Sequence, residues 1–249
     1  MNRPTLLLVV LATPFSLIHC NRDQTASKPK EPNAASKISS NSDVPLLPVK
    51  KGDRWIYDVR LEIPSGVTSS GAAAVEKKFV RTRTYVGKVV PSKGLPEVDC
   101  FEVTVPGSPT ELEYVDLLED RILMRGSHTL RDEETKPMFF ESPIPLISAD
   151  MKPGTESPEI RTAEGSMFRK IKVVARESVD VPAGKYQSIR LLMTGTDGGI
   201  ELRRTIWFSP GVGIVKEEKS RYRGEKLLFR EEHSLSTTKP DLRISRALK

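Results

Sequence analysis

The chain has 249 residues and a formal net charge of +6, from 39 Lys and Arg against 33 Asp and Glu. Its hydrophobic share of 37% suffices for a sheet core, and its 19 prolines and 16 glycines favour turns over long helices. Residues 51–236 hold 29 basic and 29 acidic side chains, so the charge excess lies toward the two ends. The central part therefore needs no basic face, and the composition argues against a nucleic-acid partner.

The first twenty residues have the layout of a bacterial export signal. An apolar run over residues 6–18 is shorter than the roughly 20 residues that a membrane-spanning helix needs. The run leads into the tetrapeptide LIHC at residues 17–20, which resembles a lipobox, with His19 where Gly, Ala or Ser is usual. This resemblance implies a lipoprotein-type signal peptide (residues 1–20) and acyl chains such as palmitate on Cys20. We therefore expect an exported lipoprotein of the bacterial cell envelope, anchored in a membrane and facing the periplasm or the outer membrane.

Composition divides the rest of the chain into three segments. Residues 21–48 are rich in Ser, Ala, Lys, Asn and Pro and cannot bury enough apolar surface to offset the entropy of ordering, which predicts a disordered tether. Residues 49–236 carry strand patterns and predict a single β domain, and residues 237–249 predict a basic, flexible tail. Cys100 lies in a strand-like run and is expected to be a buried thiol, because an acylated Cys20 offers it no disulfide partner. The less favoured alternative is a Cys20–Cys100 disulfide in a chain whose Cys20 is not acylated.

The domain opens with apolar residues that alternate with polar ones at the period of a β-strand. The residues predicted to share the buried face are Trp55, Tyr57, Val59, Leu61 and Ile63.

Beyond the first strand, a Ser- and Gly-rich turn precedes residues 76–90, which predict a pair of strands. Residues 99–105 alternate again and end at a Pro-Gly turn. Residues 108–126 fit either a helix, which a Ser-Pro-Thr-Glu capping box would begin, or two strands with a turn near residues 119–121. We favour two strands, because acidic and apolar residues alternate after the box.

Three prolines interrupt the apolar residues 136–147, and proline cannot donate a hydrogen bond to a central strand. The segment therefore predicts an apolar connector that lies against the sheet.

The last third of the chain is the most regular part. Gly-containing hairpin turns separate short alternating runs, a pattern that predicts a mainly β fold built as an antiparallel meander with little helix. The five predicted strands are residues 167–180, 186–196, 200–209, 212–220 and 226–235.

Three motifs resemble a group of uncharacterised bacterial exported proteins. These are GDRWIY at residues 52–57, VPAGKY at 181–186 and WFSPGVGIVK at 207–216, and the resemblance covers most of residues 51–235. The segment PGTES at 153–157 departs from the group, because it lacks the tryptophan often found after that glycine. Such proteins look like relatives of the half-barrel shared by periplasmic lipoprotein-localisation factors. The resemblance implies a curved half-barrel-like sheet around an apolar interior, and it implies no activity.

The sequence contains none of the local motifs that mark common catalytic or metal sites, so we expect a non-catalytic protein without a cofactor. His128 and His233 lie in polar contexts with no nucleophile motif nearby. Carboxylates cluster at residues 111–120 and 132–134, but neither cluster has the spacing of a calcium loop, so we expect solvated faces and no metal.

A curved sheet needs something in its concave face, and an acyl chain is one candidate. The aromatic residues that we expect to line such a cavity are Trp55, Tyr57, Phe101, Phe168 and Phe229. The same spacing is also typical of ordinary core residues. Trp207 is expected on the opposite face of its strand from Ile206 and Phe208. There it either covers a second packing layer, which we favour, or marks a surface for a partner.

These observations favour a lipid-anchored envelope lipoprotein that binds a hydrophobic acyl-chain ligand or an envelope protein partner. Two alternatives stay open. One is a structural or assembly lipoprotein with a solid core and no ligand, and the other is an exported hydrolase whose active site follows no motif.

Overall fold

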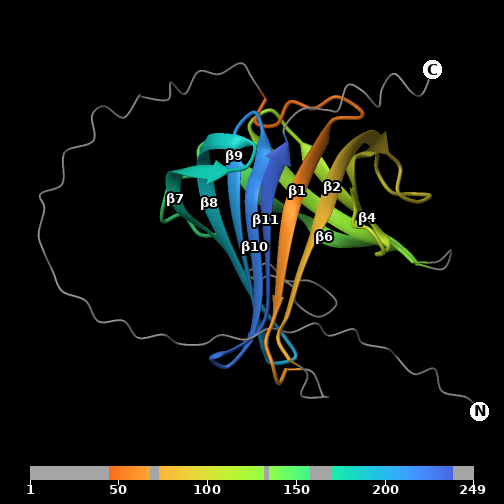
Figure 1. The fold of residues 1–249 in the computed structure, drawn as a ribbon. Helices are drawn as coiled ribbons and strands as arrows, with labels where there is room; N and C mark the ends of the chain where they lie inside the picture. Colours follow the sequence, from red (N-terminus) through yellow and green to blue (C-terminus); the bar gives the residue numbers. More distant parts are fainter. Residues whose placement is uncertain (1–44, 68–72, 132–134, 158–169, 238–249) are drawn as a thin grey trace, which may run out of the picture.

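A computed structural model describes residues 45–67, 73–131, 135–157 and 170–237 of the chain, and Figure 1 shows their arrangement. Within these ranges all regular structure is β-strand, and no helix is long and apolar enough to cross a membrane. The predicted signal peptide with Cys20, most of the tether, residues 238–249 of the tail, and Phe168 lie outside the described residues. The strands are β1 (Arg54–Ile63), β2 (Val75–Val89), β3 (Val98–Thr104), β4 (Thr110–Leu117), β5 (Arg121–Leu130), β6 (Met138–Ser148), β7 (Lys170–Val181), β8 (Gly184–Asp197), β9 (Ile200–Ser209), β10 (Gly213–Arg223) and β11 (Lys226–Thr237).

The eleven strands form one antiparallel sheet in the order β6-β5-β4-β3-β2-β1-β11-β10-β9-β8-β7. Every pair of successive strands is hydrogen-bonded except β6 and β7, which are the two edges, and β1 pairs with β11 at the centre. The sheet curves so that β4 and β6 lie across from the β8–β11 side (Figure 1). The predicted antiparallel meander and its half-barrel-like shape are confirmed.

The two edges approach each other at one end without pairing. The guanidinium of Arg176 in β7 donates to the backbone carbonyls of Ala149 and Met151, just after β6, over 3.2 and 2.9 Å. The sheet is therefore an open, curled barrel.

β1 has the predicted burial pattern. Its inward side chains from Trp55 to Ile63 are at most 5% exposed, whereas Asp58 and Arg60 face solvent. The last third also folds as predicted, into β7 to β11, and residues 108–126 form the favoured two strands, β4 and β5.

Two predictions about strands were wrong. Residues 76–90 form one long strand, β2, because no turn-forming pair interrupts them and Gly87 produces only a register shift. In the segment 136–147, the residues from Met138 onward belong to β6, so this segment is a strand and not a connector. β6 tolerates Pro143 and Pro145 because it is an edge strand. Two register shifts also interrupt its pairing with β5.

The folded part also begins earlier than residue 49. Leu46 and Leu47 are buried in the main core, and their backbone ties two turns together. The Leu46 N–H donates to Glu119 O after β4 over 2.8 Å, and its carbonyl accepts from the Gly211 N–H before β10 over 2.9 Å. This short segment closes the end of the curled sheet at which β1 starts.

Gly126 in β5 is required by the close approach of β6. A Cβ at this position would lie 2.0 Å from the Met138 carbonyl oxygen, an atom of the backbone that cannot move aside freely. The absence of a side chain also leaves room for Phe139 to stack on Tyr114, with ring centroids 5.2 Å apart.

We therefore expect Gly126→Ala to lower the free energy of unfolding by about 1–3 kcal/mol, the range for overpacking. Urea unfolding followed by circular dichroism measures the change. Ser127→Ala, at the next position, adds no atom and is the control. Equal stability of the two variants would contradict the close approach of β6.

Candidate binding cavity

A cavity of about 430 Å³ lies between the β4–β6 side of the curled sheet and the β8–β11 side. One wall is a row of cross-strand partners on a single face: Met193 of β8 pairs with Arg204 of β9, then Lys219 of β10, then Glu231 of β11. The apolar side chains that line the cavity are Val115, Met124, Phe140, Ile144, Leu146, Met193, Leu202, Ile214 and Phe229. The charged residues that line it are Arg83, Glu111, Glu113, Arg203, Arg204, Lys219, Arg221 and Glu231.

The pairing register of β2 turns two arginines into this interior. Tyr57 and Trp55 of β1 face the core, and their cross-strand partners are Arg81 and Arg83, which must share that face. Both arginines are less than 9% exposed, whereas Val80, the residue just before Arg81, is 43% exposed. β2 thus presents its basic residues inward.

Glu113 of β4 holds both arginines. It accepts hydrogen bonds from Arg83 Nε over 2.8 Å and from Arg81 Nη2 over 3.1 Å. Arg83 also lies over the face of Phe101, 3.5 Å from the ring centroid, which adds a cation–π contact. Burial raises the pKa of Glu113, but the charges of Arg83 and Arg81 outweigh it and hold the pKa at about 2.

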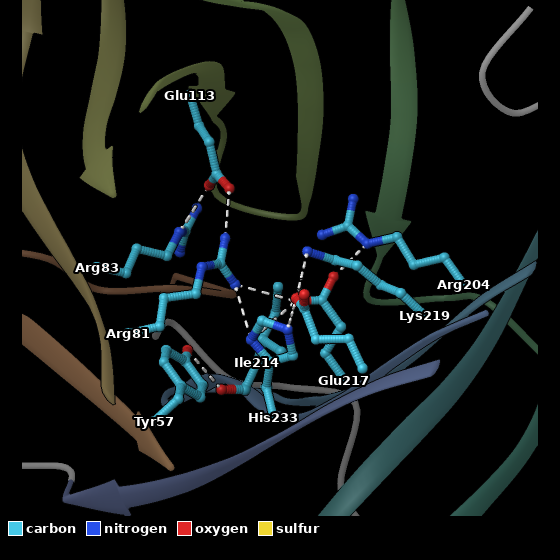
Figure 2. A network of polar contacts seen from close by, with 10 residues as sticks. Tyr57, Arg81, Arg83, Glu113, Arg204, Ile214, Glu217, Lys219 and His233 are labelled. Atoms are coloured by element: carbon cyan, nitrogen blue, oxygen red, sulfur yellow. Dashed lines mark hydrogen bonds and ion pairs between the residues drawn. The ribbon is translucent and has the colours of Figure 1, made fainter. Parts of the chain in front are cut away.

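Glu217 of β10 is the centre of the network and is fully buried (Figure 2). Arg81 Nη1 donates to it over 3.0 Å, Arg204 Nε donates to its other oxygen, and Lys219 Nζ lies 3.8 Å away. Burial alone would raise the pKa of Glu217, yet the surrounding cations, Arg204 foremost, hold it well below its usual range. An ionised carboxylate is therefore kept inside the domain.

His233 of β11 completes the network as a neutral ring. Its Nδ1 lies 3.4 Å from Arg81 Nη1 and must accept, because a guanidinium can only donate. Its Nε2 therefore carries the proton and donates to Glu231. Burial lowers the pKa of His233, which agrees with this tautomer.

Glu111 differs from the other carboxylates of the cavity wall in its contacts. Among the described residues it makes no hydrogen bond and no ion pair, although it lies in the field of Lys219, Arg81 and Arg204. Burial, and then the charge of Glu113, raise its pKa.

The aromatic residues expected to line a cavity occupy different places. Phe229 lies in the cavity wall. Trp55, Tyr57 and Phe101 are at most 5% exposed and lie in the closed core, outside that wall. Trp55 Nε1 donates to Val212 O over 2.6 Å and Tyr57 Oη to Ile214 O over 2.9 Å, so both tie β1 to the start of β10.

The remaining singled-out residues lie away from the cavity. Trp207 lies opposite Ile206 and Phe208 as expected, and it is covered there by Lys216 and by Glu177, to which it donates over 2.7 Å. His128 contacts Thr135. Cys100 is buried, and burial raises its pKa to about 11, as expected of an unreactive thiol.

Three of the acidic positions weighed as calcium ligands, Glu113, Asp116 and Asp120, are paired with arginines. Asp116 pairs with Arg125 over 2.7 Å and Asp120 pairs with Arg121 over 2.8 Å. Within the part of the chain that the structure describes, no group of three or more His, Cys, Asp or Glu is arranged to hold a metal ion. Residues 132–134 lie outside that part.

Most charged residues of the network have no distinguishing sequence signal. Arg81 and Arg83 alternate with Thr82 and Thr84, so neither face of β2 is clearly apolar by pattern. Only the register that places them opposite Tyr57 and Trp55 decides which face is buried.

Comparison with known proteins finds only distant structural similarity. No family model matches the chain, and no curated protein is significantly similar to it in sequence. Two solved structures are similar. One is a candidate exported protein with a YmcC-like fold from Bacteroides fragilis NCTC 9343, with a TM-score of 0.44, 14% identity, and coverage of 78% of this chain and 98% of that one. The other is a candidate lipoprotein from Parabacteroides distasonis ATCC 8503, with a TM-score of 0.42, 15% identity, and coverage of 79% and 99%. A likeness of this extent assigns no function to the chain.

Proposed function

We propose that this protein is a non-catalytic, lipid-anchored lipoprotein of the bacterial envelope whose domain binds an amphiphilic ligand in the cavity. The observation that carries the ligand-binding part is the cavity itself, which lies in the common size range of small-molecule sites, about 300–1,000 Å³. Nine apolar side chains from both sides of the curled sheet line it, as expected of a site for an acyl chain.

Export and anchoring rest on the sequence. The apolar run before Cys20 and the lipobox-like tetrapeptide support acylation of that cysteine, and the polar residues 21–48 supply a tether. A ligand-binding domain on such a tether would stay close to the membrane that supplies or receives the ligand.

The cavity disfavours the alternative of a structural lipoprotein with a solid core. The hydrolase alternative has no support from His233, because its two ring nitrogens contact Arg81 and Glu231 and neither contacts, in the described part of the chain, a Ser, Thr or Cys that it could activate.

We expect Met193→Trp to lower the affinity for a neutral naphthylamine fluorescent probe by about tenfold, because the larger side chain enters the cavity. Leu192→Trp is the matched control, since the neighbouring side chain points to the other face of β8. Thermal unfolding of both variants checks that each is folded. If both variants bind the probe as the parent does, the cavity is not the binding site.

A further inference from the structure

Two cations stand directly opposite each other on the cavity face of β9 and β10. Arg204 is the cross-strand partner of Lys219, and like charges in this position destabilise a sheet. Glu217 offsets part of the repulsion, and Figure 2 shows both cations reaching it from the same side. Glu217 also pairs with Arg81, and Lys219 also lies 3.6 Å from Glu231, so three cations share these two carboxylates.

Most N–H groups of Arg204 and Lys219 donate no hydrogen bond within the described residues. Arg204 donates through Nε to Glu217, and its two terminal amino groups have no hydrogen-bond partner among the described residues. Lys219 Nζ lies 3.8 Å from Glu217 and 3.6 Å from Glu231, which are ion-pair distances but too long for hydrogen bonds. Both side chains line the cavity. A guanidinium and an ammonium with free N–H groups at one place are a ready-made receptor for an oxyanion.

A third cation continues the same wall. Arg221 lines the cavity with its guanidinium 5.6 Å from the centroid of the Phe229 ring, and it forms no ion pair within the described part of the chain. Two carboxylates of the wall already accept hydrogen bonds from the protein. Glu113 accepts them from Arg81 and Arg83, and Glu231 accepts one from His233. Among the described residues, Glu111 is the one carboxylate of the cavity wall that has no hydrogen bond and no ion pair.

We infer that the amphiphile bound in the cavity carries an anionic headgroup, a carboxylate or a phosphate, that accepts hydrogen bonds from Arg204 and Lys219. Its apolar chain then lies against Leu202, Met193 and the facing residues of β5 and β6. The inference rests on the proposed function and adds the chemical class of the ligand. Carboxylate and phosphate share the oxyanion chemistry, so both belong to the test.

Isothermal titration of the full chain carrying Cys20→Ser, purified without detergent, tests the headgroup with three probes of equal chain length. Dodecanoate and dodecyl phosphate are the two anionic arms, and dodecanol is the neutral one. We expect at least one anionic probe to bind about tenfold or more tightly than dodecanol, as a charge-assisted hydrogen bond allows. The order of the two anions identifies which headgroup the cavity prefers.

Two substitutions are expected to act in opposite directions. Lys219→Gln should weaken binding of the preferred anion by about tenfold. Glu111→Gln should strengthen it by about fivefold, because it removes an opposing charge from the wall. Neither should alter the affinity for dodecanol. Lys185→Gln, at the exposed start of β8, is the matched control.

The outcomes separate the two claims. Equal affinity for all three probes, or anion affinities that neither substitution changes, overturns the headgroup inference and leaves the cavity function standing. No binding of any probe overturns both. Because Glu111→Gln removes no hydrogen bond or ion pair among the described residues, it keeps the test decisive even if Lys219→Gln unfolds the domain.

Discussion

Glu217→Gln is expected to lower the free energy of unfolding by about 3–5 kcal/mol, the largest effect of any single substitution that we predict. The side chain is fully buried and is the carboxylate between Arg81, Arg204 and Lys219. Neutralising it removes one of the two carboxylate partners of buried Arg81 and the carboxylate that pairs with Arg204. Domains of this kind are stable by about 5–15 kcal/mol, so the loss is a large share of the total.

Glu218→Gln is the matched control for this prediction. Glu218 is the next residue along β10, points to the other face, and pairs with Arg230 over 2.8 Å at a partly exposed site. We expect a cost of about 1 kcal/mol or less, as for surface ion pairs. Urea unfolding of the two variants measures the difference. Similar, small costs for both would mean that the buried network does not stabilise the domain.

Acid should destabilise the domain strongly between about pH 4.5 and pH 2. The folded-state pKa values of Glu113 and Glu231 are both about 2, from an ordinary value of 4.5. A carboxyl with a depressed pKa stabilises the fold above its unfolded-state pKa, and this contribution is lost as the pH falls toward the folded-state value. Each carboxyl contributes on the order of 3 kcal/mol, because one pKa unit corresponds to about 1.36 kcal/mol.

His233 extends this loss to higher pH. Burial lowers its pKa from the ordinary 6.5, so the unfolded chain takes up a proton on this ring before the folded chain does. Destabilisation from this residue therefore begins as the pH falls below about 6.5. Glu111 acts in the opposite sense, because its pKa is raised and its charge opposes folding at neutral pH.

Urea unfolding at a series of pH values from 7 to 3 measures the acid effect. A Glu113→Gln variant should be less stable at pH 7 and should show a shallower fall between pH 4.5 and pH 3, since one of the titrating carboxyls is gone. If the parent protein keeps its full stability at pH 3, the described ion pairs do not control its stability.

The sequence predicts the fold well where turn chemistry and alternation agree. The β9–β11 region has Gly-containing turns and clear period-two runs, and β9 has the predicted bounds. β6 is different, because its two prolines argue against a strand and only its position at the sheet edge makes a strand possible. Edge position is a property of the whole sheet and cannot be read from a local segment.

The candidate site is less predictable than the fold. The sequence suggests large aromatic residues such as Trp55 and Phe101 as cavity-lining residues, but these side chains fill the core. The cavity wall instead holds Met193, Leu202 and a set of charged residues that the cross-strand register brings together. Arg204 and Lys219 are 15 positions apart and meet only through the β9–β10 pairing, with its register shift near Ile214.

Native mass spectrometry with lipid extraction tests the ligand-binding claim most directly. The sample is the full chain with Cys20→Ser, purified without detergent and incubated with a bacterial lipid extract. We predict a reproducible added mass that extracts as a lipid and that is lost in Met193→Trp but kept in Leu192→Trp. A bare polypeptide mass under the same conditions would contradict the account, and the cavity would then not be a site for amphiphiles.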